Sequence, residues 1–307
     1  MEKGLPIQIK LPSSFYEEEI RNDFKVTEKT KELWAIQLDL LAKLDEVCKK
    51  YDIRYYADSG TLLGAIRHKG FIPWDDDIDV ELFRDDYIRL CEVAEKEFTH
   101  PYFFQTEYTD PGSLRGHAQL RNSLTTGILT VEKGLGRQFN QGIFIDIFVT
   151  DYIPDDPTER ETFFDTAREL LYKAQRHEIK IRRYDPNESS KIQLYHKFTR
   201  LINAGKKDMP NEYYHEFEDY IIKNCAKPTK EHVKIVFNLA PTRKPFMTEW
   251  YKDVVEVPFE TIKVPVPKMY DKALINFYGE NWSVPILQTT AHGGMIIDTR
   301  KPYTEYL

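Results

Sequence analysis

Four aspartates lie within five residues of one another: Asp75, Asp76, Asp77 and Asp79. Alternate residues of an extended chain point to the same side, so we expect Asp75, Asp77 and Asp79 together and Asp76 opposite. Carboxylates this close repel one another unless a divalent cation lies between them, and oxygen ligands without a nearby cysteine favour Mg²⁺ or Mn²⁺. The alternative is a solvated acidic loop, which the apolar residues on both sides argue against.

A further acid, Asp146, interrupts the apolar run IFIDIF at 143–148. A charged side chain inside such a run is costly to bury unless it has a partner. We therefore predict that Asp146 comes from a neighbouring strand and completes the metal site. The alternative is an aspartate on an edge strand that faces water.

The turn Ser59-Gly60-Thr61 is expected where a strand leads into a helix, and backbone N–H groups at a helix N-terminus favour phosphate. Four basic residues could pair with phosphate charge: Arg67, His68, Lys69 and Arg121. Taken one at a time, these features are also typical of an ordinary turn and of surface cations. Their order along the chain, a turn and then acids on two strands, is the plan of a nucleotidyltransferase site.

The elements that must position these residues follow from hydrophobic periodicity and from Gly and Pro boundaries. Helices are predicted at 30–50, within 59–70, at 85–98 and from Asp156 onward, and strands at 53–57, 78–83, 101–106, 116–121 and 142–149. Residues 257–282 predict a strand pair and then a helix that ends at Gly279.

This order predicts an α/β fold with a mixed sheet. We expect an N-terminal extension at 1–29 and a nucleotidyltransferase-like core at 30–155. The remainder, 156–307, is expected to be mostly helical, with a C-terminal segment that packs back on the core.

The composition narrows the class of protein. The 307 residues carry a net charge of −7, which argues against binding a nucleic acid polymer. Three scattered cysteines indicate neither a disulfide framework nor a zinc site. With no signal peptide or long apolar run in the sequence, we expect a cytoplasmic protein.

The charge is unevenly spread. Residues 75–86 hold seven acidic residues and one arginine, whereas residues 168–207 hold eleven basic and four acidic residues. The basic segment could face an anionic acceptor or the inner face of a membrane, and the alternative is a solvated pair of helices.

Four segments in this order resemble the LicD family of phosphocholine-type transferases, and the first is also similar to fukutin and the fukutin-related proteins. They are SGTLLGAIRHKGFIPWDDDIDVELFRDDY at 59–87, HAQLRNSLTT at 117–126, GIFIDIF at 142–148 and VPFETIKVPVPKMYDKALINFYGENWSVP at 257–285. The resemblance spans about residues 50–295. It implies a nucleotidyltransferase fold and a metal-dependent transfer of a phospho-alcohol from a CDP-linked donor, with release of CMP.

The resemblance also implies roles for the candidate residues. Asp77, Asp79 and Asp146 would be the catalytic acids and would hold Mg²⁺ or Mn²⁺, with Asp75 in or beside the ligand set, and Asp146 could also take the acceptor proton. The donor phosphates would meet the turn and the basic residues: Ser59, Gly60, Thr61, Arg67, His68, Lys69 and Arg121. The acceptor would be a hydroxyl of a surface glycan or its lipid-linked precursor.

Two other functions fit the same residues. One is a nucleotidyltransferase that moves the nucleoside monophosphate itself, because the same metals serve either reaction. The other is a non-catalytic module that binds a nucleotide or a glycan, against which the intact carboxylates argue.

Overall fold

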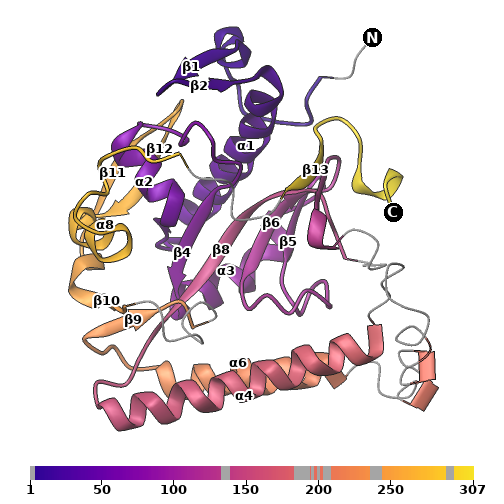
Figure 1. Ribbon diagram of the computed structural model, residues 1–307, viewed down its shortest axis with the longest axis vertical. Helices are drawn as coiled ribbons and strands as arrows, with labels where there is room; N and C mark the ends of the chain where they lie inside the picture. Colours follow the sequence, from indigo (N-terminus) through magenta and orange to yellow (C-terminus); the bar gives the residue numbers. More distant parts are fainter. Residues whose placement is uncertain are drawn as a thin grey trace.

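The computed structural model describes residues 4–132, 139–182, 194, 197–198, 201–202, 209–235, 244–287 and 294–307. A mixed sheet runs through the centre, and a pair of long helices lies across one end of it (Figure 1). The α/β fold with a mixed sheet that the sequence predicts is therefore confirmed.

The longest strand, β8, forms the middle of the sheet. It runs parallel to β4 on one side and antiparallel to β6 on the other, and β3 and β5 extend the sheet at the two edges. A short pair, β9 and β10, joins the last residues of β8. The strands are β3 (Tyr56–Ala57), β4 (Asp79–Phe83), β5 (Tyr102–Gln105), β6 (Ala118–Asn122), β8 (Ile143–Tyr152), β9 (Glu231–Val233) and β10 (Phe246–Met247).

The apolar side of this sheet packs against two helices, α1 (Glu28–Tyr51) and α3 (Arg84–Glu97). Alternation in the strands puts Ile78, Val80 and Ile145 in the core at 0% exposure, and these residues separate the polar ones. Helix α1 begins at a Thr27 cap, whose hydroxyl accepts a hydrogen bond from the N–H of Thr30.

The two helices that lie across the end of the sheet are α4 (Pro157–Arg182) and α6 (Met209–Cys225), and they pack side by side (Figure 1). They enclose a hydrophobic cluster of their own around Phe163, Leu171 and Phe217. Half of the basic segment 168–207 lies outside the described residues, so its predicted contacts stay a prediction.

The remaining segments pack around the core. Val26 of β2 and Val264, Val266 and Leu274 of the C-terminal part belong to the same core cluster as the sheet. These elements are β1 (Glu19–Arg21), β2 (Phe24–Val26), α2 (Ser59–Arg67), β7 (Thr126–Leu129), β11 (Val254–Phe259), β12 (Ile262–Pro267), α8 (Tyr270–Tyr278), β13 (Met295–Asp298) and four 3₁₀ turns, Ser13–Tyr16, Thr130–Glu132, Thr248–Tyr251 and Tyr303–Glu305.

Most of the elements predicted from the sequence are confirmed, including the strand pair and the helix that stops at Gly279, where φ is +85°. The prediction of strand 53–57 was too long, because only Tyr56–Ala57 pairs with β4. The strand pairs at both ends of the chain, β1–β2 and β13–β7, were not predicted. None of the described helices is both long and apolar enough to cross a bilayer.

Candidate active site

Two neighbouring strands place two carboxylates opposite each other. In the parallel pair β4–β8, Asp79 and Asp146 are partners in register. The N–H of Asp146 donates to the carbonyl of Ile78 at 2.9 Å, which fixes that register at the start of β4. Because both residues alternate with buried isoleucines and valines, their side chains share the polar side of the sheet.

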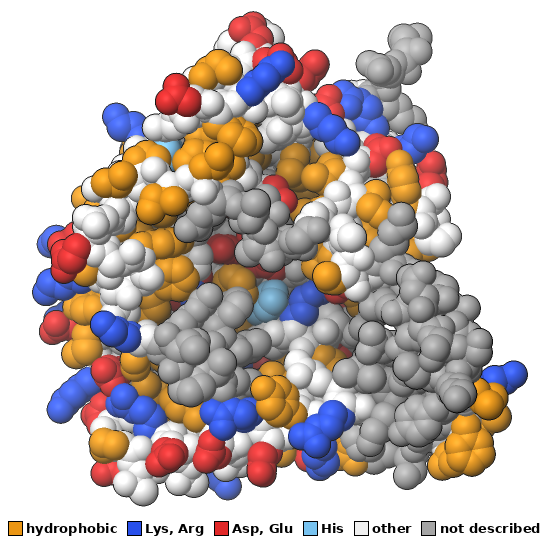
Figure 2. Space-filling view, viewed as in Figure 1, with side chains coloured by type: hydrophobic (Ala, Val, Ile, Leu, Met, Phe, Trp, Pro, Cys, Tyr) orange, Lys and Arg blue, Asp and Glu red, His pale blue; other side chains and the backbone are white. Residues whose placement is uncertain are grey.

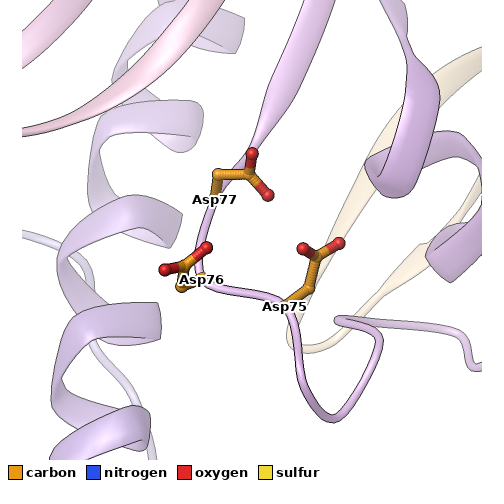
Figure 3. A group of neighbouring side chains, drawn as sticks. All are labelled: Asp75, Asp76 and Asp77. Atoms are coloured by element: carbon orange, nitrogen blue, oxygen red, sulfur yellow. The ribbon is translucent and has the colours of Figure 1, made fainter. Parts of the chain in front are cut away.

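The loop before β4 brings further acids to the same place. One carboxylate oxygen from each of Asp75, Asp76 and Asp77 lies within 4.8 Å of the others. Figure 3 shows Asp75 and Asp77 on one side of the loop and Asp76 turned toward a helix on the other side. The loop is held on α1, where Trp34 Nε1 donates to the carbonyl of Asp75 and Gln37 Nε2 to that of Asp76.

We call Asp75, Asp76, Asp77, Asp79 and Asp146 the acidic cluster. Burial raises the pKa of Asp79 well above its ordinary value, and the charges of Asp77, Asp146 and Asp58 raise it further. The structure thus brings the carboxylates of the Asp75–Asp77 loop together and places Asp77 and Asp146 close enough to Asp79 for their charges to raise its pKa. Such an all-oxygen donor set fits Mg²⁺ or Mn²⁺, which would relieve this repulsion.

Two side chains hold Asp146 in place. Gln119 Nε2 donates to Asp146 Oδ1 at 2.7 Å, and His117 Nε2 lies 3.1 Å from the same oxygen. Burial by itself would raise the pKa of Asp146, but the hydrogen bond and charge of His117, the hydrogen bond of Gln119 and the charge of Arg115 together outweigh it and lower the pKa. Asp146 is therefore a carboxylate that the fold keeps ionised and oriented.

Arg121 is linked to Asp146 through Gln119. It is 1% exposed, and its guanidinium donates to Gln105, to Gln119 and to the carbonyl of Gly142. Burial, followed by the charge of Arg115, lowers the pKa of Arg121 to about 9. In this structure Arg121 contacts the glutamine that orients Asp146, and its hydrogen bonds run within the sheet.

The predicted phosphate turn lies at the first turn of α2. Thr61 Oγ1 accepts a hydrogen bond from the N–H of Asp79 at 2.8 Å, so the turn is tied directly to β4. A Cβ on Gly60 would lie 2.5 Å from Asp75 Oδ2, which shows how closely the backbone approaches the acidic cluster. Ser59 adopts a φ of +46° and donates from its hydroxyl to Asp58 at 3.1 Å.

The predicted basic loop lies at the other end of α2. Arg67 donates from Nη1 to the carbonyl of Trp282 at 3.0 Å and from Nε to His68 at 2.9 Å. Burial, followed by the charge of Arg67, lowers the pKa of His68 to about 4, so its ring is neutral near pH 7. Lys69 is exposed, with a φ of +58°. These residues join α2 to the C-terminal segment.

Several residues beside the acidic cluster were not identified from the sequence. Lys234 forms a buried ion pair with Asp58, and both side chains are 4% exposed. Burial, and then the charges of Asp58 and Asp79, raise the pKa of Tyr278, which ends α8. A lysine inside the apolar run HVKIV was the one visible signal for Lys234, whereas nothing local distinguishes His117 or Tyr278.

Figure 2 shows acidic, basic and histidine side chains together in a hollow near the middle of the face of the molecule that is drawn.

The family model described as the LicD/FKTN/FKRP nucleotidyltransferase domain matches residues 52–176. Residues 52–176 form a LicD-family domain. This domain contains every site residue predicted from the sequence, whereas Lys234 and Tyr278 belong to the chain that follows it.

Comparison with characterised and uncharacterised proteins extends this match. The chain is 28% identical over 258 residues to the lipopolysaccharide cholinephosphotransferase LicD of Haemophilus influenzae, covering 83% of this chain and 92% of that protein. It is 33% identical over 116 residues to an uncharacterised protein of Rickettsia prowazekii, covering 38% and 39% of the two chains. A stretch of 40 residues, 13% of this chain and 8% of the other, is 45% identical to the mouse ribitol 5-phosphate transferase FKRP.

Proposed function

We propose that this protein is a metal-dependent transferase that moves a phospho-alcohol from a CDP-linked donor to a hydroxyl of a glycan or its lipid-linked precursor. The observation that carries the proposal is the register pairing of Asp79 with Asp146 beside the Asp75–Asp77 loop, within the LicD domain. Two relatives with this likeness are named as transferases of phosphocholine and of ribitol 5-phosphate. The new bond joins the acceptor oxygen to phosphorus, and the bond from phosphorus to the CMP oxygen breaks.

Asp75, Asp77, Asp79 and Asp146 would hold Mg²⁺ or Mn²⁺. When bound, the ion supplies Lewis-acid stabilisation of charge on the phosphate oxygens. The pKa of Asp146 is lowered, so this carboxylate stays ionised and suits a permanent ligand better than a base that must keep a proton. His117 and Gln119 fix its direction, and Arg121 in turn fixes Gln119.

The first turn of α2 is proposed to receive the diphosphate. The Ser59-Gly60-Thr61 backbone lies against Asp75 and β4, so a phosphate there would lie beside the acidic cluster. Arg67, His68 and Lys69 at the far end of α2 would stabilise the C-terminal segment and the outer part of the donor.

A contact with a membrane surface is also proposed for the basic segment 168–207. Within the part of it that the structure describes, Leu194, Phe198, Leu201 and Ile202 expose more than 60% of their surface at helical spacing. Apolar residues flanked by lysine and arginine are typical of helices that lie on anionic membranes. Binding to vesicles with and without phosphatidylglycerol tests this contact.

The test of the reaction incubates the full chain with Mn²⁺, a glycan that supplies acceptor hydroxyls and, separately, CDP-choline, CDP-ethanolamine, CDP-glycerol and CDP-ribitol, and measures CMP. We expect CMP release from one donor, its abolition by EDTA and its recovery on addition of Mn²⁺ or Mg²⁺. The Asp77→Ala variant is the negative control. Release of pyrophosphate from CTP or ATP, with no CMP from any CDP-alcohol, would overturn the proposal in favour of transfer of a nucleoside monophosphate.

A further inference from the structure

Lys234 is a buried lysine that lies outside the LicD domain, directly after β9. Its ammonium group pairs with the carboxylate of Asp58 and lies 3.5 Å from Ser59 Oγ. The rings of Phe148 and Phe277 lie 5.4 and 5.9 Å from the same nitrogen and shield it from water. The fold thus buries a positive charge at the first turn of α2.

The surroundings of this ammonium group are acidic. Burial alone would lower the pKa of Lys234, but the charges of Asp58, Glu81 and Asp79 outweigh it and raise the pKa. Glu81 is 1% exposed and lies two residues beyond Asp79 on the same side of β4. Lys234 therefore offsets negative charge at the edge of the acidic cluster.

Asp58 connects this charge to the phosphate turn and to β4. Its N–H donates to the carbonyl of Asp79 at 3.0 Å, and its carbonyl accepts from the N–H of Leu62 at 3.0 Å in the first turn of α2. Thr61 makes the return contact by accepting from the N–H of Asp79. A change in the ion pair is therefore transmitted to the turn and to the start of β4.

We propose that Lys234 is a positioning residue of the donor site, which holds the Asp58–Ser59 turn in place and lowers the negative charge that an incoming diphosphate meets. The identity of the donor rests on the proposed function. The positive charge of Lys234 should weaken the binding of a divalent cation and strengthen the binding of the anionic donor. Without it, a divalent cation binds the acidic cluster more tightly, whereas an anionic donor binds less tightly.

The experiment compares full-length wild type, Lys234→Met and Lys234→Arg by calorimetry. Titration with Mn²⁺ alone should show affinity at least 3-fold tighter for Lys234→Met. Titration with CDP-choline at saturating Mn²⁺ should show affinity at least 10-fold weaker for this variant. Lys234→Arg keeps the positive charge, so both affinities should return to within 3-fold of wild type.

Lys31→Met is the matched control, because Lys31 is a buried lysine, 3% exposed, whose ion-pair partner Glu19 belongs to the N-terminal strand pair. Its two affinities should match those of wild type. A purely structural role for Lys234 would weaken the binding of Mn²⁺ and donor together. That outcome, or donor binding equal to wild type in Lys234→Met, overturns the proposal.

The double variant Asp58→Asn/Lys234→Met covers the case in which Lys234→Met does not fold, because it removes both charges of the Lys234–Asp58 ion pair. It should bind Mn²⁺ about as well as wild type and the donor at least 10-fold less well, and full donor affinity would overturn the proposal. If wild type turns over no CDP-alcohol, the proposed function fails, but the Mn²⁺ titrations need no nucleotide and still decide the role of Lys234.

Discussion

The two ends of the β4–β8 strand pair differ in the charged side chains that they bring together. At the start of β4, Asp79 is the register partner of the buried Asp146, so two acidic side chains lie next to each other. At the other end, Arg84 follows β4 and its guanidinium donates to both oxygens of Asp151 at 2.8 and 2.7 Å and to Glu218 of α6 at 3.0 Å. One end brings together charges that repel, and the other pairs charges that attract.

This difference indicates that one end of the strand pair stabilises the fold and the other end forms the functional site. The Arg84 cluster joins the sheet to the α4–α6 layer, and its guanidinium forms ion pairs with both Asp151 and Glu218. In the acidic cluster, burial and the neighbouring acids raise the pKa of Asp79, and the charge of Lys234 offsets this rise only in part. Repulsion that the protein relieves only in part indicates a site that a cation completes.

The sharpest test of the comparison is Asp79→Asn. Losing one metal ligand should reduce CMP release by roughly 10³-fold, since the ion contributes several kcal/mol to the transition state. The melting temperature of the metal-free protein should stay the same or rise, because the substitution removes a repulsive charge. CMP release and thermal unfolding in EDTA measure the two effects. A large loss of stability would mean that the acids are structural.

The opposite result is expected for Arg84→Met. Asp151 and Glu218 would stay buried without their cation, which should cost about 3–5 kcal/mol in the free energy of unfolding. Urea denaturation measures that loss. The folded fraction should bind Mn²⁺ with wild-type affinity. A loss of Mn²⁺ binding at temperatures where the variant is folded would contradict the separation of the two ends.

Acid should act on the structural end through His232. This residue is 0% exposed beside Phe83 and Tyr251, and burial, followed by the charge of Lys234, lowers its pKa to about 3. In the unfolded chain His232 takes up a proton near pH 6.5, whereas in the folded protein it stays neutral until the pH approaches 3. Stability that is present above pH 6.5 is therefore lost as the pH falls toward 3. The loss between pH 6.5 and 5 should be about 1.6 kcal/mol.

The check is urea denaturation of wild type and His232→Phe at both pH values. The aromatic substitution keeps the ring contacts and removes the titrating group. Between pH 6.5 and 5, the free energy of unfolding of His232→Phe should fall less than that of wild type, and the difference should equal the loss predicted above for His232. Equal losses in the two proteins would show that His232 is not the group responsible.

The acids of the site could be identified from the sequence, because each one breaks an apolar pattern that has a local cause. Asp79 alternates with Ile78 and Val80, and Asp146 interrupts an isoleucine-rich strand. Their pairing in register could not be derived, since 67 positions separate strands whose parallel alignment depends on the whole sheet. The family resemblance supplied that link.

The partners of the cations show the limit more clearly. Arg121 was visible as a charged residue on a strand, but Gln105, which accepts its Nε–H, lies on a different strand. Lys234 meets Asp58 across 176 positions, so no spacing rule connects them. Sequence patterns identified charges in unusual places, whereas the groups that compensate them depend on tertiary packing.

Two glycines of α2 offer the smallest and most selective test. A Cβ on Gly60 would lie 2.5 Å from Asp75 Oδ2, the end of a side chain that can turn away, whereas one on Gly64 would lie 2.4 Å from the backbone carbonyl of Gly70. Gly60→Ala should therefore change the free energy of unfolding by less than about 1 kcal/mol. It should reduce CMP release by about 10-fold to 100-fold, because it displaces Asp75.

Gly64→Ala is the matched control on the same helix. The carbonyl of Gly70 cannot move without the loop that follows α2, so this variant should lose more stability than Gly60→Ala. Thermal unfolding and CMP release of the two variants, measured side by side, check the contrast. If Gly60→Ala were the less stable of the two and kept full activity, Asp75 would not belong to the working part of the acidic cluster.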